Sequence, residues 1–591
     1  MTYQAPMRDI LFNVEHLSSW SQVRALPKYA DVDQDDVEAA LTGFSRFCSE
    51  VIAPLGRIGD EKGASFDRNC VTMPTQYEKA YQQYVDMGWQ SLAHSVDFGG
   101  MGLPLVAGTA STEMLNSADM SFGLCPLLTN GAIDALQEMG SEKQKARYLA
   151  KLISGEWSGT MNLTEPQAGS DLGRIRCRAE RHQDGTYKIS GTKIFITYGE
   201  HDLSGNIIHL VLARTHGAPE GPKGLSLFVV PKFLEGTDGS HDRRNAVKCV
   251  SIEHKLGVRA SPTSVLEYEG ATGFLVGAEN RGLVHMFVMM TSARFSVGIQ
   301  GVAISENAYQ KSLAYARDRV QGKALAGKSP DAVPIIDHPD VQRMLMRMRA
   351  LTEGGRALAY ATAGWIDLAK NGNAEQKPQA DRIAEFLVPL VKGFCTETSV
   401  EVTSLGIQIH GGMGFIEETG IAQLYRDARI LPIYEGTTSI QANDLLGRKI
   451  LRDGGETARW FAEKVARTEK ALCTGSSQAQ LIADKLAIAR GSFEESLAWF
   501  LKTAPHDTRA AFSAGVPFLM LAGNLAAGWQ LGRSVLAAES LLQKETQSDF
   551  LQQKIGTAKF YMQHVLVECC AEKSRIVEGA DSLLAGTFLK D

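Results

Sequence analysis

A block of short strand-like segments is embedded in a sequence that otherwise follows a helical period. Between Trp157 and about Glu279, apolar and β-branched runs alternate with glycine and proline, and Asp184-Gly185 gives a hairpin signal. On both sides of this block, apolar residues recur every three or four positions, as in amphipathic helices. The chain must therefore bury an antiparallel β domain of roughly 120 residues between helical domains.

The length of 591 residues is too great for a single hydrophobic core. We expect an α+β multidomain protein in which an N-terminal helical domain, a middle antiparallel β domain and a C-terminal helical bundle are followed by an extra helical domain. The predicted parts are an N-terminal extension (1–35), the N-terminal helical domain (36–156), the β domain (157–282), the bundle (283–453) and the additional helical domain (454–591). Residues 1–35 show little periodicity.

Composition excludes several classes of protein. The net charge of −6 leaves no electrostatic footprint for nucleic acid. Nine scattered cysteines without a C-x-x-C pair suggest neither a disulfide framework nor a metal site, and reduced thiols fit a cytoplasmic protein. The uncharged run 511–532 approaches membrane-spanning length, but it contains Pro517 and polar residues. We interpret it as a buried bundle helix and expect no stable membrane insertion.

One carboxylate occupies a distinctive position in the bundle. Glu435 lies in the sequence IYEGTT (433–438), after Ile433 and Tyr434 and before Gly436, at the start of a helical pattern. An apolar setting raises the pKa of a carboxylate and improves it as a base, and the glycine lets a ligand approach the backbone. On local sequence alone, a solvated residue that favours the helix dipole is the simpler interpretation.

Three further segments have patterns that suit a cofactor. Residues 163–171 (LTEPQAGSD) combine small hydroxyl residues with glycine, which leaves backbone N–H groups free for phosphates and carbonyls. Residues 193–197 (KIFIT) form a strand that ends in a hydroxyl, and residues 408–415 (QIHGGMGF) form a glycine-rich turn after a long helix. Each segment in isolation is equally compatible with an ordinary loop, edge strand or helix end.

Taken together and in this order, the segments resemble the acyl-CoA dehydrogenase family. The resemblance extends over residues 36–452 and includes segments 98–104, 140–145, 154–156, 163–171, 193–197, 255–261, 315–319, 408–415 and 425–438. The family implies the fold described above, with FAD held between the β domain and the bundle. Glu435 matches the family's catalytic base, and we expect no metal.

The resemblance also assigns residues to the cofactor and the substrate. It implies that Thr164 and Thr197 bind the flavin ring, that Phe195 lies beside it and that Ser170 binds the pyrophosphate. Other matched positions are Arg319, Gln408, Gly411 and Gly412, which would hold the FAD of a neighbouring subunit, Thr437 and Ser439 beside the FAD, and Tyr434 and Arg294 near the substrate. Three departures are Phe195 in place of tryptophan, Ser439 in place of glutamine, and Gly322 where the common pattern inserts a phenylalanine.

The activity that this resemblance implies is the α,β-dehydrogenation of an acyl-CoA thioester to the trans-2-enoyl-CoA. Electron-transfer flavoprotein is the expected electron acceptor, and a homodimer the expected assembly, with a homotetramer as the alternative. The N-terminal run from Tyr3 and the segment 434–445 look closest to bacterial family members that convert 3-methylmercaptopropionyl-CoA to methylthioacryloyl-CoA during dimethylsulfoniopropionate degradation.

Other functions stay open at this point. A general short-, medium- or long-chain acyl-CoA dehydrogenase of β-oxidation would have the same motifs, and very-long-chain members also have an added C-terminal domain. An acyl-CoA oxidase would share much of the architecture. A non-catalytic FAD-bearing homologue that binds nucleic acid should lack the base and show a basic face, whereas this chain retains Glu435 and is acidic.

Overall fold

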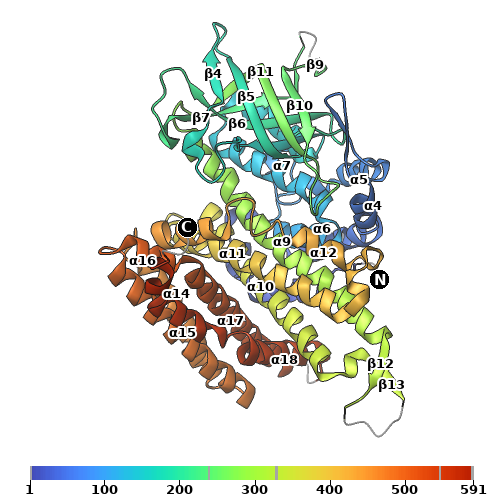
Figure 1. Cartoon of the computed structure of the whole chain (residues 1–591), viewed down its shortest axis with the longest axis vertical. Helices are drawn as coiled ribbons and strands as arrows, with labels where there is room; N and C mark the ends of the chain where they lie inside the picture. Colours follow the sequence, from blue (N-terminus) through green and yellow to red (C-terminus); the bar gives the residue numbers. More distant parts are fainter. Residues whose placement is uncertain (1–2, 237–239, 326–330, 545–546, 587–591) are drawn as a thin grey trace.

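The computed structural model places a sheet domain at one end of a bundle of very long helices, with a second helical bundle along the side (Figure 1). It describes residues 3–236, 240–325, 331–544 and 547–586. Two large hydrophobic cores and one small cluster organise the described residues. One large core joins the sheet domain to the helices that cover it, and the other runs through the N-terminal helices, the long helices and the C-terminal bundle. The small cluster joins residues 23–29 to Leu368 and Ala380.

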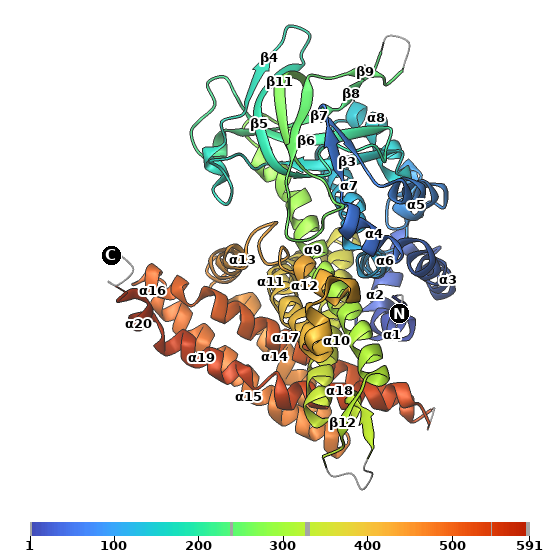
Figure 2. The same ribbon diagram turned by 45° about the vertical axis from the view of Figure 1, so that its right-hand side comes forward.

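The N-terminal part is helical and packs beside the long helices (Figure 2). Its elements are α1 (Met7–His16), α2 (Trp20–Arg24), η1 (Pro27–Tyr29), α3 (Gln34–Phe47), η2 (Cys48–Ile52), α4 (Leu55–Lys62), β1 (Ser65–Asp67), β2 (Cys70–Thr72), α5 (Thr75–Asp86), η3 (Trp89–Ser91), η4 (Val96–Phe98), α6 (Leu105–Ala118), α7 (Met120–Met139) and α8 (Glu142–Ser154). Capping boxes begin α3, with Asp33 and Asp36, and α8, with Ser141 and Gln144.

The sheet domain is mostly antiparallel and folds back on itself. Its elements are β3 (Trp157–Asn162), η5 (Leu172–Arg174), β4 (Arg178–Arg181), β5 (Tyr187–Thr197), β6 (Asn206–Thr215), η6 (Pro222–Gly224), β7 (Leu225–Pro231), β8 (Phe233–Leu234), β9 (Arg243–Arg244), β10 (Val247–Ile252) and β11 (Thr263–Val276). The strand order is β10-β11-β5-β4-β6-β3, and β7 pairs with both β11 and β6. Both β3 and β4 run parallel to β6, which the expectation of an antiparallel domain did not include.

Three long helices, α9 (Gly282–Asp318), α10 (Pro339–Asn371) and α11 (Lys377–His410), form the spine of the molecule. Three shorter elements lie between α9 and α10: β12 (Val320–Lys323), β13 (Ala332–Pro334) and η7 (Ile335–Asp337). After α11 come η8 (Gly411–Phe415), η9 (Glu417–Thr419), α12 (Ile421–Ala428), α13 (Thr438–Asp444) and the π-helical η10 (Leu445–Ile450). Glycines let α9 and α11 approach closely. A Cβ at Gly298 would lie 2.5 Å from Val391, and one at Gly301 would lie 2.4 Å from the carbonyl oxygen of Cys395. This contact brings the middle of α9 next to the part of α11 that carries Lys392.

The C-terminal bundle packs directly on α10 and α11. It consists of α14 (Glu456–Leu472), α15 (Ser477–Thr503), α16 (Thr508–Ser513), α17 (Gly515–Leu542), α18 (Asp549–His564), α19 (Glu568–Glu578) and α20 (Ala580–Leu584). The uncharged run forms much of α17, which is the buried central helix, as predicted. Among the described helices, α9 is long and apolar enough to cross a membrane by length and composition alone, yet 72% of its apolar window is buried inside the molecule.

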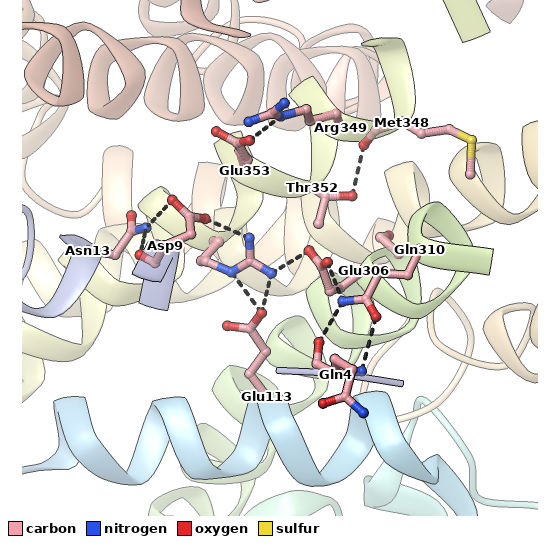
Figure 3. A network of polar contacts seen from close by, with 12 residues as sticks. Gln4, Asp9, Asn13, Glu113, Glu306, Gln310, Met348, Arg349, Thr352 and Glu353 are labelled. Atoms are coloured by element: carbon pink, nitrogen blue, oxygen red, sulfur yellow. Dashed lines mark hydrogen bonds and ion pairs between the residues drawn. The ribbon is translucent and has the colours of Figure 1, made fainter. Parts of the chain in front are cut away.

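The N-terminal extension is more ordered than its sequence predicts. Residues 7–16 form α1, whose Asp9 lies in a buried ionic network with Arg356 of α10 and Lys554 of α18. Figure 3 shows Asp9 and the nearby acids Glu113, Glu306 and Glu353. Arg356 also pairs with Glu113 of α6 and Glu306 of α9. The extension, the N-terminal helices, the spine and the C-terminal bundle therefore meet at one point. The five-part division of the chain stays a prediction, which the changes of element type along the chain support.

Candidate active site

Glu435 lies in a tight loop between α12 and α13. Its backbone has a φ of +54°, in the left-handed region, and Gly436 follows with a φ of +86°. A non-glycine residue in this region costs on the order of 1–3 kcal/mol and persists only where its surroundings hold it. The Thr437 side chain accepts a hydrogen bond from the backbone N–H of Ile440 and is the N-cap of α13. Glu435 precedes this cap, so the interpretation of Glu435 as a first-turn capping acid is wrong.

Side chains from two helices hold the loop. Lys392 of α11 donates to the carbonyl oxygens of Leu431 (2.9 Å) and Gly436 (2.7 Å). Gln441 of α13 donates through Nε2 to the carbonyl oxygens of Glu435 and Gly436, both at 3.2 Å. The backbone on both sides of Glu435 is thus fixed from inside the molecule.

The protein environment raises the pKa of the Glu435 carboxyl group above its value in water. Burial raises its pKa to about 7, and the charges of Arg294 and Lys392 oppose the rise. Arg294 is buried on α9 and pairs with Asp444 at 3.4 Å. Within the described residues, its Nε has no hydrogen-bond partner. The carboxyl group therefore exchanges its proton near neutral pH, as a general base should.

A cavity of about 710 Å³ lies between α6, α7, α9 and the start of α11. Phe295 of α9 and Val388 of α11 line it. They lie next to Arg294 in sequence and one helical turn from Lys392, respectively. A second cavity of about 650 Å³, more polar in lining, continues along α6 and α9.

A hydrogen-bonded chain connects the catalytic loop with α6, the helix that lines both cavities. Tyr434 donates through its hydroxyl group to Gln300, and Gln300 donates to Asn116 of α6 at 2.9 Å. Asn116 lines both cavities; along α9, Ile299 lines the first and Ile304 the second. We call Tyr434, Gln300 and Asn116 the amide wall. Its Asn116 lies where the two cavities adjoin, and its Tyr434 directly precedes Glu435.

The segment 163–171 is attached to strand β5 by a buried ion pair. Lys193 is fully buried and donates to Glu165 Oε1 and to the carbonyl oxygen of Leu163, both at 2.9 Å. The backbone N–H of Ile194 donates to the carbonyl oxygen of Thr164, so Thr164 lies beside the strand that ends at Thr197. Ser170 is exposed on the same segment. Phe195 has a φ of +59°, and 59% of its side chain is exposed.

The remaining predicted residues lie in two places. Thr437 and Ser439 are at the start of α13, close to Glu435. Arg319 follows α9, and Gln408, Gly411 and Gly412 end α11. Arg319 is roughly 37 Å from Arg294, because 25 helical residues rise about 1.5 Å each. The fold of a single chain therefore does not bring these four residues to the predicted flavin segments.

Sequence analysis missed Lys392, Gln300, Asn116 and Gln441. Lys392 left a signal, because it is the lone charge in the otherwise apolar run 386–394. The other three are amides within helical patterns, and only their partners in space distinguish them. No cluster of metal-ligating side chains occurs in the part of the chain that the structure describes.

Four family models match this chain: the acyl-CoA dehydrogenase N-terminal domain (34–156), middle domain (160–271) and C-terminal domain (280–450), and an acetyl-CoA dehydrogenase C-terminal-like domain (456–586). The chain belongs to the acyl-CoA dehydrogenase family, whose members are oxidoreductases. The fold is thus that of the family with an extra C-terminal domain, as expected.

Two relatives and two solved structures are similar to the chain over almost its whole length. The chain is 66% identical over 588 residues to a 3-methylmercaptopropionyl-CoA dehydrogenase of Ruegeria pomeroyi, and the match covers 100% of both chains. It is 33% identical to a broad-specificity linear acyl-CoA dehydrogenase of Mycobacterium tuberculosis, covering 95% of each. Among solved structures, ACDH-11 of Caenorhabditis elegans in complex with C11-CoA has a TM-score of 0.79 at 20% identity, covering 99% of this chain and 96% of that one. An acyl-CoA dehydrogenase of Bacillus anthracis complexed with FAD has a TM-score of 0.75 at 22% identity, covering 95% and 92%.

Proposed function

We propose that the protein is an FAD-dependent dehydrogenase that converts 3-methylmercaptopropionyl-CoA to methylthioacryloyl-CoA. The observation that carries this proposal is Glu435, a carboxyl group with a pKa of about 7 held in a strained loop between two buried cations, Arg294 and Lys392. The relative that is 66% identical over its whole length has this activity in its name. The substrate fits dimethylsulfoniopropionate degradation in the cytoplasm.

Glu435 would remove the proton from the α-carbon of the thioester. This proton is only weakly acidic, so the thioester carbonyl must be polarised as the proton leaves, and the backbone N–H of Glu435 is the donor that we assign to this task. Arg294 and Lys392 stabilise the ionised base before the transfer. Together with a hydrogen and its electron pair from the β-carbon, loss of this proton leaves the trans double bond.

The protein surface fits the predicted cofactor. Phe195 on the β domain and Ile433 on the catalytic loop, 59% and 47% exposed, are large apolar side chains of the kind that a flat ring system covers. Gly169, Gly411 and Gly412 have open space where a side chain would be, which suits close approach of phosphates. FAD would supply the two-electron acceptor. Thr164, Thr197, Ser170, Thr437 and Ser439 would hold it.

A second subunit would complete each cofactor site. Arg319, Gln408, Gly411 and Gly412 lie too far from the β domain of their own chain, which supports their predicted role toward a neighbour's FAD. Met413 and Phe415, 49% and 86% exposed, accompany them on η8 and give that surface an apolar character suited to an interface. We therefore propose a homodimer, with electron-transfer flavoprotein as the electron acceptor.

Substitution of Glu435 tests the assignment. Glu435→Gln keeps the shape of the side chain but removes the base, so kcat should fall roughly 10²–10⁴-fold while the flavin absorbance is retained. Activity is measured anaerobically with ferrocenium and 3-methylmercaptopropionyl-CoA. Glu463→Gln, on the exposed face of α14, is the matched control and should leave turnover unchanged. Full activity in Glu435→Gln would contradict the proposal.

A further inference from the structure

Lys392 is a fully buried lysine whose ammonium group binds backbone rather than a carboxylate. It lies on α11 within an apolar run, and its two hydrogen bonds go to the carbonyl oxygens of Leu431 and Gly436. Within the described residues it forms no ion pair. Burying an ammonium group without a direct counter-ion is costly, so such a group is retained only where it has a specific task.

The two carbonyl groups lie on either side of Glu435. One ammonium group therefore joins the beginning of the loop to the residue directly after the base. Two side chains of the loop also bind the spine: the hydroxyl group of Tyr434 donates to Gln300 of α9, and that of Thr438 donates to Glu397 of α11. Lys392 differs from both because it reaches from the spine to the loop backbone before and after Glu435.

The charges around Glu435 show why a cation is needed at this position. Arg294 faces the carboxyl group from α9, but Asp444 of α13 neutralises it in part. Lys392 faces it from α11, where Glu397 is the other nearby acid, and the hydroxyl group of Tyr434 lies within the loop itself. Burial lowers the pKa of Lys392 to about 8, and the charge of Glu435 opposes that shift. Near neutral pH each of the two groups therefore favours the charged form of the other.

We propose that Lys392 is a positioning residue for the reaction: it holds the Glu435 loop in its strained conformation and supplies the positive charge that lets the base ionise. This inference rests on the proposed role of Glu435. It assigns Lys392 no contact with substrate or cofactor. A lysine suits the task because its ammonium group donates in several directions from a narrow stem that fits between packed helices.

The test compares Lys392→Met, which removes both the hydrogen bonds and the charge, with Lys392→Gln, which removes the charge and keeps a donor. In both variants the acidic limb of the kcat/KM profile should move up by about one pH unit, because Glu435 loses a stabilising cation. At high pH, where the base is ionised, Lys392→Met should remain roughly 10–100-fold less active because the loop is displaced, and Lys392→Gln should recover part of that loss.

Hydrogen exchange gives a readout that is independent of turnover. The loop amides, for example those of Tyr434 and Thr438, should exchange faster in Lys392→Met than in the wild type, in the FAD-loaded protein. Lys573→Met is the control for loss of one lysine, since Lys573 lies on α19 and pairs with Glu495 at the surface. It should shift neither the pH profile nor the loop exchange.

The outcomes separate this inference from the proposed function. If Glu435→Gln is inactive while Lys392→Met and Lys392→Gln keep the wild-type pH profile and loop exchange, only the inference about Lys392 is wrong. If Glu435→Gln is active, the proposed base is wrong, and the positioning role proposed for Lys392 is wrong with it. Should Lys392→Met fail to fold, Lys392→Gln decides the question through the same pH profile and exchange rates.

Discussion

Two features of Glu435 lower the stability of the folded protein and are absent from an ordinary surface carboxylate. Its backbone is in the left-handed region, and its side chain is partly buried beside Tyr434 and two helices. Strained and desolvated groups of this kind are concentrated at functional sites, because they destabilise the fold and are retained mainly where function requires them. Of the seven other described non-glycine residues with positive φ, Phe195 and Tyr198 lie in or directly after the segment 193–197, which the family resemblance assigns to the flavin.

The pKa of Glu435 predicts how activity and stability depend on pH. If Glu435 is the base, kcat/KM should rise with pH to a half-maximum near 7 and then level off. The folded-state pKa lies above the ordinary value of 4.5, so folding favours the protonated acid. This contribution to stability is fully present below pH 4.5 and is lost as pH rises through 7.

Glu435→Gln should therefore be more stable than the wild type at pH 8, by on the order of 2 kcal/mol, with the difference shrinking toward pH 5. Thermal unfolding of both proteins at the two pH values measures this, with Glu463→Gln as the control for loss of one exposed carboxylate. An equal difference at pH 5 and pH 8 would mean that the pKa of Glu435 is not raised.

At the scale of elements, the sequence predicts most of the architecture, and the omissions have physical causes. Local periodicity located the sheet block and the long helices, because each has a continuous apolar stripe or alternation. It missed α1, where two of the five buried residues, Asp9 and Asn13, are polar. Asp9 is buried because Arg356 and Lys554 meet it from far along the chain. Lys392 was missed for the same reason, since its partners lie 39 and 44 residues away.

The packing of α6 against α9 bears on the choice of substrate. Cavities of about 710 Å³ and 650 Å³ lie along these helices, and Asn116 of the amide wall lines both. A short acyl group such as methylmercaptopropionyl would end at the wall. A long chain would have to pass it and leave buried amides without partners, which costs about 1–3 kcal/mol for each group. The wall thus favours a short-chain substrate over the long-chain alternative.

Shortening the wall should change the preference for chain length. We expect Asn116→Ala, which opens the first cavity to the second, to raise kcat/KM for octanoyl- and palmitoyl-CoA relative to 3-methylmercaptopropionyl- and butyryl-CoA by about tenfold or more. The panel of four substrates is compared with Ser111→Ala, which lies on α6 at the far side of the first cavity. If the ratios stay unchanged in Asn116→Ala, the wall does not limit the acyl group.

At the scale of the whole molecule, the ionic network joins parts that the family resemblance treats as additions. Asp9 comes from the extension, Lys554 from the C-terminal bundle, and Arg356 and Glu353 from α10. Arg356 also binds Glu113 and Glu306, so the charges of the extension, the C-terminal bundle and the spine compensate one another within one buried network. The extension and the added domain are therefore built as a single structural unit with the spine.

Loss of one charge from this network should destabilise the protein far more than loss of a surface pair. Lys554→Met leaves Asp9 and Glu353 buried with fewer partners, and we expect a loss of roughly 3–5 kcal/mol. Lys573→Met, which removes an exposed pair with Glu495, should cost roughly 0–1 kcal/mol. The double variant Asp9→Asn/Lys554→Met should be less unstable than the sum of its single changes, because each removes the partner that the other leaves unpaired. Thermal and denaturant unfolding of the wild type, the three single variants (Asp9→Asn included) and the double variant measure these losses. Equal losses for Lys554→Met and Lys573→Met would show that the network does not couple the added parts to the spine.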